Sequence, residues 1–167
     1  MRDQRFVAAH RGGRLSKERH QQLMGWAVDC AEHVLPLIVE GDDRLQEILE
    51  TARAWARGEV PVGNAQKASV QAHALAREFV NPATVAVARA VGQAVATAHM
   101  ADHSLGGALY ALKAIEATGK PIEPERTWQN ERLPLEIKDL VLSAWEQKGL
   151  DRMLKSKTKP TALSSVS

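Results

Sequence analysis

The fold is decided by the run Ala94-Val-Ala-Thr-Ala-His-Met-Ala-Asp-His-Ser-Leu-Gly-Gly-Ala-Leu-Tyr-Ala-Leu-Lys-Ala-Ile115. This run belongs to a longer segment, 82–119, that is rich in alanine and carries almost no charge. Alanine is the best helix former and allows neighbouring helices to approach closely. The segment therefore predicts two largely buried helices, Pro82 to about Met100 and about His103 to Thr118, and leaves open whether they are joined. Gly106-Gly107 disfavours a helix interior, so it predicts close contact with another backbone.

Apolar stripes with helical spacing continue on both sides of this segment. Ser16 is a good N-cap, Asn81-Pro82 is a strong helix start, and Pro36 predicts a break near 33–35. Strict alternation of polar and apolar residues is absent, so strands are not expected. The predicted fold is all-α, a compact bundle of six to seven mostly antiparallel helices, with HEAT-like stacking as an alternative. The further helices are predicted at 17–39, 43–57, 64–79, 125–132 and 134–148.

Charge divides the 167-residue chain into a body and two basic ends. The net charge is +2 overall, but residues 21–147 carry −6, whereas 1–20 and 148–167 carry +4 each. An acidic body repels nucleic-acid phosphates and favours a basic protein partner. We expect residues 1–148 to form a single helical domain and 149–167 to be a basic, disordered tail.

Cysteine content and hydropathy restrict the location of the protein. Cys30 is the only cysteine, which excludes an internal disulfide and a multi-cysteine zinc site. No 18 consecutive residues are apolar, and the first residues lack the apolar segment of a signal peptide. These features predict a cytoplasmic protein without a membrane span.

A polar cluster interrupts the apolar segment at His99, Asp102 and His103. On a continuous helix the two histidines, four residues apart, would share one face. Asp29 and His33 of the first helix are candidate partners. One interpretation is a metal centre of a helical enzyme, with His33, His99 and His103 as ligands. The favoured interpretation is a structural network that caps helix ends, without a cofactor.

Two further groups are candidates for chemistry. His10, Arg11 and Arg14 precede the start of a helix, a position that commonly binds an anion or an acidic partner. The alternative interpretation is that these basic side chains form ion pairs with the acidic body of the protein. No P-loop motif is present. Cys30 and His33 are three residues apart on the predicted helix, a spacing that suits a catalytic thiol and the base that activates it. The favoured interpretation is a buried cysteine with a structural role.

Four stretches of the chain resemble one family, the immunity proteins similar to the fifth immunity class of bacterial polymorphic toxin systems. The resemblance covers about 9–144 and contains no known catalytic signature. It implies an all-α protein of the bacterial cytoplasm that binds and neutralises a toxin domain. The stretches are His10-Arg-Gly-Gly-Arg-Leu-Ser16, Trp26-Ala-Val-Asp-Cys-Ala-Glu-His-Val-Leu-Pro36, Ala52-Arg-Ala-Trp-Ala-Arg-Gly58 and Ala94-Val-Ala-Thr-Ala-His-Met-Ala-Asp-His103.

Three hypotheses for function follow from these observations. The first is a non-catalytic immunity protein whose acidic surface docks on a basic toxin. The second is a metal-dependent helical enzyme, and the third, the least favoured, is a nucleic-acid-associated protein that uses the basic ends. The acidic surface of the first hypothesis is formed by Glu40, Asp42, Asp43, Glu47 and Glu50.

Overall fold

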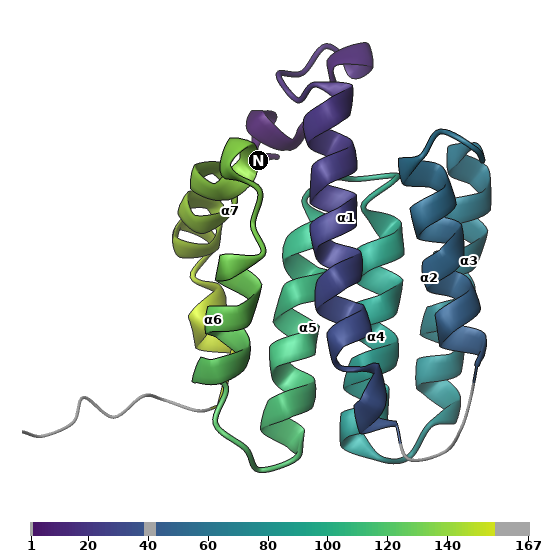
Figure 1. The fold of residues 1–167 in the computed structure, drawn as a ribbon, viewed down its shortest axis with the longest axis vertical. Helices are drawn as coiled ribbons and strands as arrows, with labels where there is room; N and C mark the ends of the chain where they lie inside the picture. Colours follow the sequence, from purple (N-terminus) through teal and green to yellow (C-terminus); the bar gives the residue numbers. More distant parts are fainter. Residues whose placement is uncertain (1, 39–42, 156–167) are drawn as a thin grey trace, which may run out of the picture.

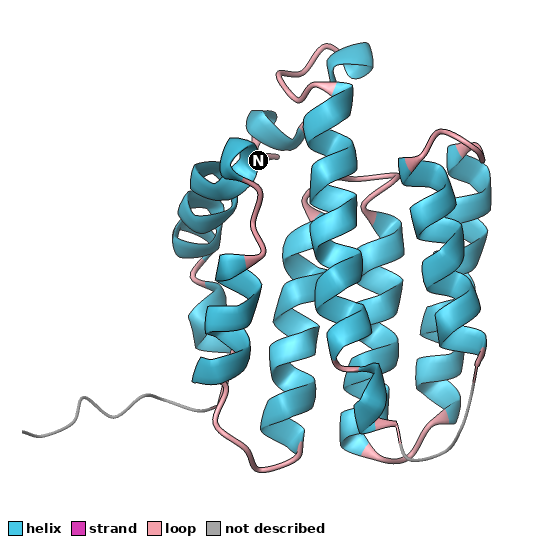
Figure 2. Ribbon diagram, viewed as in Figure 1, coloured by secondary structure: helices cyan, strands magenta, loops and turns pink. Residues whose placement is uncertain are grey.

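The structure, a computed structural model, describes residues 2–38 and 43–155. It confirms the all-α fold: seven α-helices and no strand occur in the described residues (Figure 2). Short 3-10 helices, η1 to η4, accompany them at Gln4–Phe6, Ala9–Arg11, Leu35–Leu37 and Leu150–Met153. The α-helices are α1 (Lys17–His33), α2 (Arg44–Ala56), α3 (Val62–Glu78), α4 (Pro82–Ala96), α5 (His103–Ala117), α6 (Glu123–Glu131) and α7 (Leu135–Lys148).

Helix α4 is the centre of the bundle. It packs against α1, α2, α3 and α5, and ten of its 15 residues are buried. The α2–α3 pair lies on one side of the molecule and the α6–α7 pair on the other (Figure 1). Small side chains on all sides of α4 permit these simultaneous contacts, because each neighbouring helix can approach closely.

The ends of α4 are determined by specific hydrogen bonds. At its start, the Asn81 side-chain oxygen accepts from the backbone N–H groups of Ala83 and Thr84, as the cap prediction requires. The predicted end near Met100 is wrong, because α4 ends at Ala96 and the next residues form a turn before α5. Tight i→i+3 bonds, such as His99 N–H to the Ala96 carbonyl at 3.0 Å, close this turn.

Helix α5 lies very close to its neighbours at Gly107. A Cβ atom at this position would lie 3.3 Å from the Cβ of Ala27 in α1 and 3.4 Å from the Cα of Ala94 in α4. The prediction of close contact is confirmed here. At Gly106 the nearest group is instead the side chain of Gln93.

The other helix boundaries differ from the predictions by only a few residues. Helix α1 ends at His33 and the 3-10 helix containing Pro36 follows, so the break is confirmed. Helix α3 begins at Val62, two residues before the predicted start, with Pro61 at the N-cap position. Helix α6 begins at Glu123, also two residues earlier than predicted.

The buried residue Gln129 holds helix α6 against the bundle through two hydrogen bonds. The side chain of Gln129 donates to the Ala108 carbonyl of α5 at 3.0 Å, and its backbone carbonyl accepts from Trp26 Nε1 of α1 at 2.9 Å. Buried polar groups are costly without such partners, so these bonds specify where α6 docks.

The N-terminal segment forms a closed loop over one end of the bundle. Ala9 N–H donates to the Leu15 carbonyl, and Leu15 N–H donates to the Val7 carbonyl. Gly12 has φ +82°, and a Cβ on Gly13 would lie only 1.9 Å from the Val7 oxygen. Both glycines are therefore required by a tight loop.

The chain after residue 148 continues to pack on the helices. Trp145 Nε1 donates to the Asp151 carboxylate at 2.9 Å, Arg126 pairs with the same carboxylate, and Leu154 is buried. Residues 149–155 thus belong with the helical domain rather than with the predicted tail. The rest of that tail, 156–167, lies outside the described residues.

Two glycine-to-alanine variants test this description of the loop. Gly13→Ala should destabilise the protein by about 1–3 kcal/mol, because the new methyl group collides with backbone. Gly25→Ala in α1 should stabilise it by about 0.5–1 kcal/mol, because a Cβ there meets no atom within 4 Å and alanine favours the helix. Urea denaturation measures both; equal stability of the two variants would contradict the loop geometry.

Candidate functional site

His20 links α1 to the turn between α4 and α5. It is 7% exposed, and its Nε2–H donates to the Thr97 carbonyl at 2.6 Å. That carbonyl lies at the C-terminal end of α4, where the helix itself supplies no donor. The His20 ring also packs on Trp55 of α2, with ring centroids 4.8 Å apart. One histidine therefore joins three helices at this end of the bundle.

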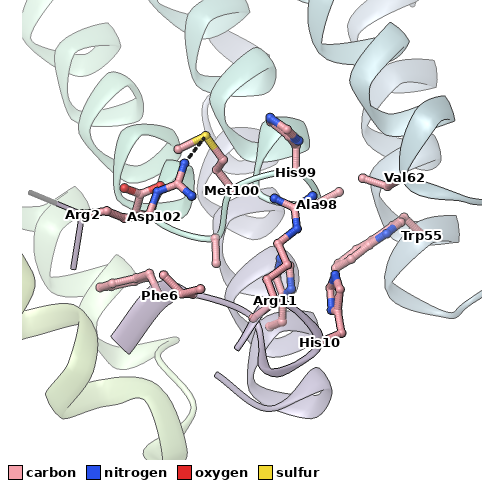
Figure 3. A pocket seen from close by; sticks show the side chains of 14 residues that line it. Arg2, Phe6, His10, Arg11, Trp55, Val62, Ala98, His99, Met100 and Asp102 are labelled. Carbon is pink, nitrogen blue, oxygen red and sulfur yellow. Dashed lines mark hydrogen bonds between the residues drawn. The ribbon is translucent and has the colours of Figure 1, made fainter. Parts of the chain in front are cut away.

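A pocket of about 110 Å³ opens beside this junction (Figure 3). The N-terminal segment forms one wall, the turn after α4 another, and Trp55 and Val62 close the third side. Two groups that the sequence analysis singled out separately meet in this pocket. Its polar lining residues are Arg2, His10, Arg11, His20, His99 and Asp102.

The charges of the pocket are mainly positive. Arg2 donates to the Met100 sulfur at 3.2 Å, and among the described residues no ion pair joins Arg2 or Arg11 to a carboxylate. Asp102 also lines the pocket, but its carboxylate lies 3.8 Å from Lys148. Arg14, the third member of the predicted basic group, is exposed and does not line the pocket.

The histidines of the predicted cluster hydrogen-bond to glutamines. His99 Nδ1 lies 2.8 Å from Gln66 Nε2 of α3, and His103 Nδ1 lies 2.7 Å from Gln93 Oε1 of α4. The amide of Gln66 donates, so His99 retains an N–H on Nε2. These bonds connect His99 of the turn to α3 and His103 at the start of α5 to α4.

Asp29 and His33 lie elsewhere, which corrects their expected partnership with this cluster. Helix α1 begins, rather than ends, beside the turn after α4, so His20 takes the place expected for His33. Thirteen residues of helix separate the two histidines, a distance of about 20 Å along the axis. The position of His20 on the stripe of Leu23 and Ala27 was the signal that could have identified it.

His33 instead belongs to a contact between α1 and α6. Its Nδ1 lies 2.7 Å from a carboxylate oxygen of the buried Glu125, and its ring stacks on Trp128 with centroids 3.6 Å apart. Arg132 lies over the Trp128 ring at 4.9 Å. Trp128 thus contacts both an imidazole and a guanidinium group, which fixes its position on α6.

Asp29 also has a structural partner. Arg53 of α2 bridges Asp29 at 3.2 Å and Glu32 at 2.9 Å, both on α1. A single guanidinium thus holds two carboxylates on the side of α1 that faces α2.

The alternative chemistries have no support from this geometry. Within residues 2–38 and 43–155, no three His, Cys, Asp or Glu side chains are grouped so that they could hold a metal ion. Cys30 is fully buried, and burial raises the pKa of its thiol well above the ordinary value, which keeps the thiol protonated. His33, its expected base, bonds to Glu125 instead.

The predicted acidic surface is described in part. Asp43, Glu47 and Glu50 are exposed at the start and along the outer face of α2, whereas Glu40 and Asp42 lie outside the described residues. Beside them a groove of about 500 Å³ runs between α2 and α3. Its lining residues are Arg44, Glu47, Ile48, Thr51, Gln71, Ala74 and Leu75.

These features define a compact helical bundle that has a small basic pocket at one end and exposed carboxylates on the outer face of α2. The chain belongs to the family described as "Imm-5 like putative immunity protein", whose sequence profile matches residues 13–136. No curated protein and no solved structure matches the chain. In the described part, every helix is too short or too polar to cross a bilayer.

Acid should weaken the junction at His20. Burial is the main cause that lowers the pKa of His20 below its ordinary 6.5, and the nearby His10 and Arg11 act in the same direction. The unfolded chain therefore binds this proton more readily, so the contribution of neutral His20 is complete above pH 6.5 and is lost as the pH falls below it. Burial likewise lowers the pKa of His73 and His103.

Urea denaturation at pH 7.5 and 5.5 measures this loss as a lower free energy of unfolding at pH 5.5. The variant His20→Gln, which keeps an N–H donor but does not titrate, should show a smaller difference between the two pH values than the wild type. An equal difference in both proteins would contradict the assignment to His20.

Proposed function

We propose that this protein is a non-catalytic, cytoplasmic immunity protein that binds a toxin domain and thereby neutralises it. The observation that carries the proposal is membership of the immunity family, because the matched region, 13–136, includes helices α1 to α6. The site supports a binding role, since the buried Cys30 thiol is unsuited to nucleophilic catalysis.

We infer that the acidic face of α2 is the surface that meets the toxin. The side chains of Asp43, Glu47 and Glu50 are exposed and form no ion pair among the described residues. Unpaired surface carboxylates attract a basic partner over several ångströms and raise its rate of association. The adjacent groove between α2 and α3 offers a concave surface for a side chain of that partner.

Charge reversal on α2 tests both parts of this proposal. The double variant Glu47→Lys/Glu50→Lys should lose protection when co-expressed with a toxin that the wild type neutralises, and its association should slow at least about tenfold at low salt. Growth rescue and binding kinetics at two salt concentrations measure these effects.

The matched control is the double variant Asp139→Lys/Glu146→Lys, which reverses two exposed carboxylates on α7 at the other side of the bundle (Figure 1). It should protect as well as the wild type. Equal loss in both variants would reject the α2 surface, whereas failure of the wild-type protein to bind the product of any neighbouring gene would reject toxin neutralisation itself.

A further inference from the structure

We propose that the pocket between the N-terminal loop and the turn after α4 is a binding site for a phosphate group. The proposal does not depend on toxin neutralisation. It rests on the side chains that line the pocket, on its volume and on the rigid loop that presents Arg11.

Two guanidinium groups reach the pocket from different parts of the N-terminal segment. Arg11 extends from η2 toward Ala98 and His99, and Arg2 lies beside Met100 at the other side of the turn (Figure 3). Neither Arg2 nor Arg11 pairs with a carboxylate within the described ranges. By contrast, Arg5, Arg53 and Arg126 each pair with a carboxylate. Two uncompensated guanidiniums match the double charge and the fork geometry of a phosphate.

The turn after α4 contributes His99 to the lining of the pocket. Gln66 bonds to Nδ1 of His99 and thereby fixes the position of the ring. The pocket thus combines side chains from η2, from the chain before η1 and from the turn. Asp102 is the opposing charge, and its attraction to Lys148 offsets part of its repulsion of an anion.

The dimensions of the pocket match a single small group. A volume of about 110 Å³ is a few times the roughly 30 Å³ that one water molecule occupies in the liquid. A second, larger pocket of about 530 Å³ shares the wall formed by His10, His20 and Trp55. A free phosphate and a phosphate monoester present the same charged group to the two guanidiniums, so they share the same recognition chemistry.

The backbone of the loop that carries Arg11 is held in one conformation. Its closure by the Ala9–Leu15 and Leu15–Val7 bonds and the obligatory Gly12 and Gly13 restrict the backbone on either side of Arg11. A preorganised donor loses less conformational entropy when its ligand binds.

Calorimetric titration with inorganic phosphate at constant ionic strength tests the site. The wild-type protein should show saturable binding, Arg11→Ala should weaken it at least tenfold, and Arg11→Lys should weaken it less than Arg11→Ala. Arg14→Ala is the matched control, because Arg14 is equally exposed in the same loop but does not line the pocket. It should bind as the wild type does.

Further measurements keep the test decisive. If circular dichroism shows that Arg11→Ala does not fold, Arg2→Ala is used in its place. In the wild-type protein, phosphate should shift the NMR signals of His99 more than those of His33. Glycerol phosphate binding more tightly than phosphate would support a monoester, and equal binding would support free phosphate. Absence of saturable binding, equal weakening by Arg14→Ala, or acetate binding as tightly as phosphate would overturn the proposal.

Discussion

The structure depends on the burial of α4 on nearly all of its sides. A helix in this position needs small side chains around its circumference, and ten of its 15 residues are buried among four neighbouring helices. Its only long polar side chains, Arg89 and Gln93, bond to histidines of the neighbouring helices α3 and α5. Further polar contacts gather at its ends, where backbone carbonyls and N–H groups lack partners within the helix. The Asn81 cap satisfies one end, and His20 satisfies the Thr97 carbonyl near the other.

The candidate site lies beside the C-terminal end of α4. His20 brings the start of α1 to the turn after α4, and the closed N-terminal loop that precedes α1 then covers the turn. In this way basic residues near the start of the chain come to lie beside His99 and Asp102 from the middle of it. The acidic residues of α2 lie on the outside of the bundle, so the protein presents a basic pocket and an acidic face as separate surfaces. This division suits the proposed binding role, in which the acidic face meets a basic partner.

Local rules account for most of the fold and for only part of the site. The stripes of α1 and α2, the caps at Ser16 and Asn81, and the break before Pro36 each depend on residues close together in sequence, and each is confirmed. The end of α4 was placed too late, because a turn closed by i→i+3 bonds follows Ala96. The Thr97 carbonyl in this turn accepts a hydrogen bond from His20, 77 positions away. The likeness to the immunity family, which the sequence profile confirms, likewise came from local strings of residues.

The amino-acid sequence by itself determined the fold class, the family and the residue types available for chemistry, since helical periodicity, capping and motif strings are local properties. Only the tertiary structure decided which of those residues meet. The direction in which α1 runs past α4 separates His33 from His99 by most of a helix length and replaces it with His20. The same packing joins Arg2 and Arg11 to the turn after α4. The direction of each helix and the close approach of one helix to another depend on contacts between distant segments. Such contacts cannot be inferred from the composition of the chain or the spacing of its residues.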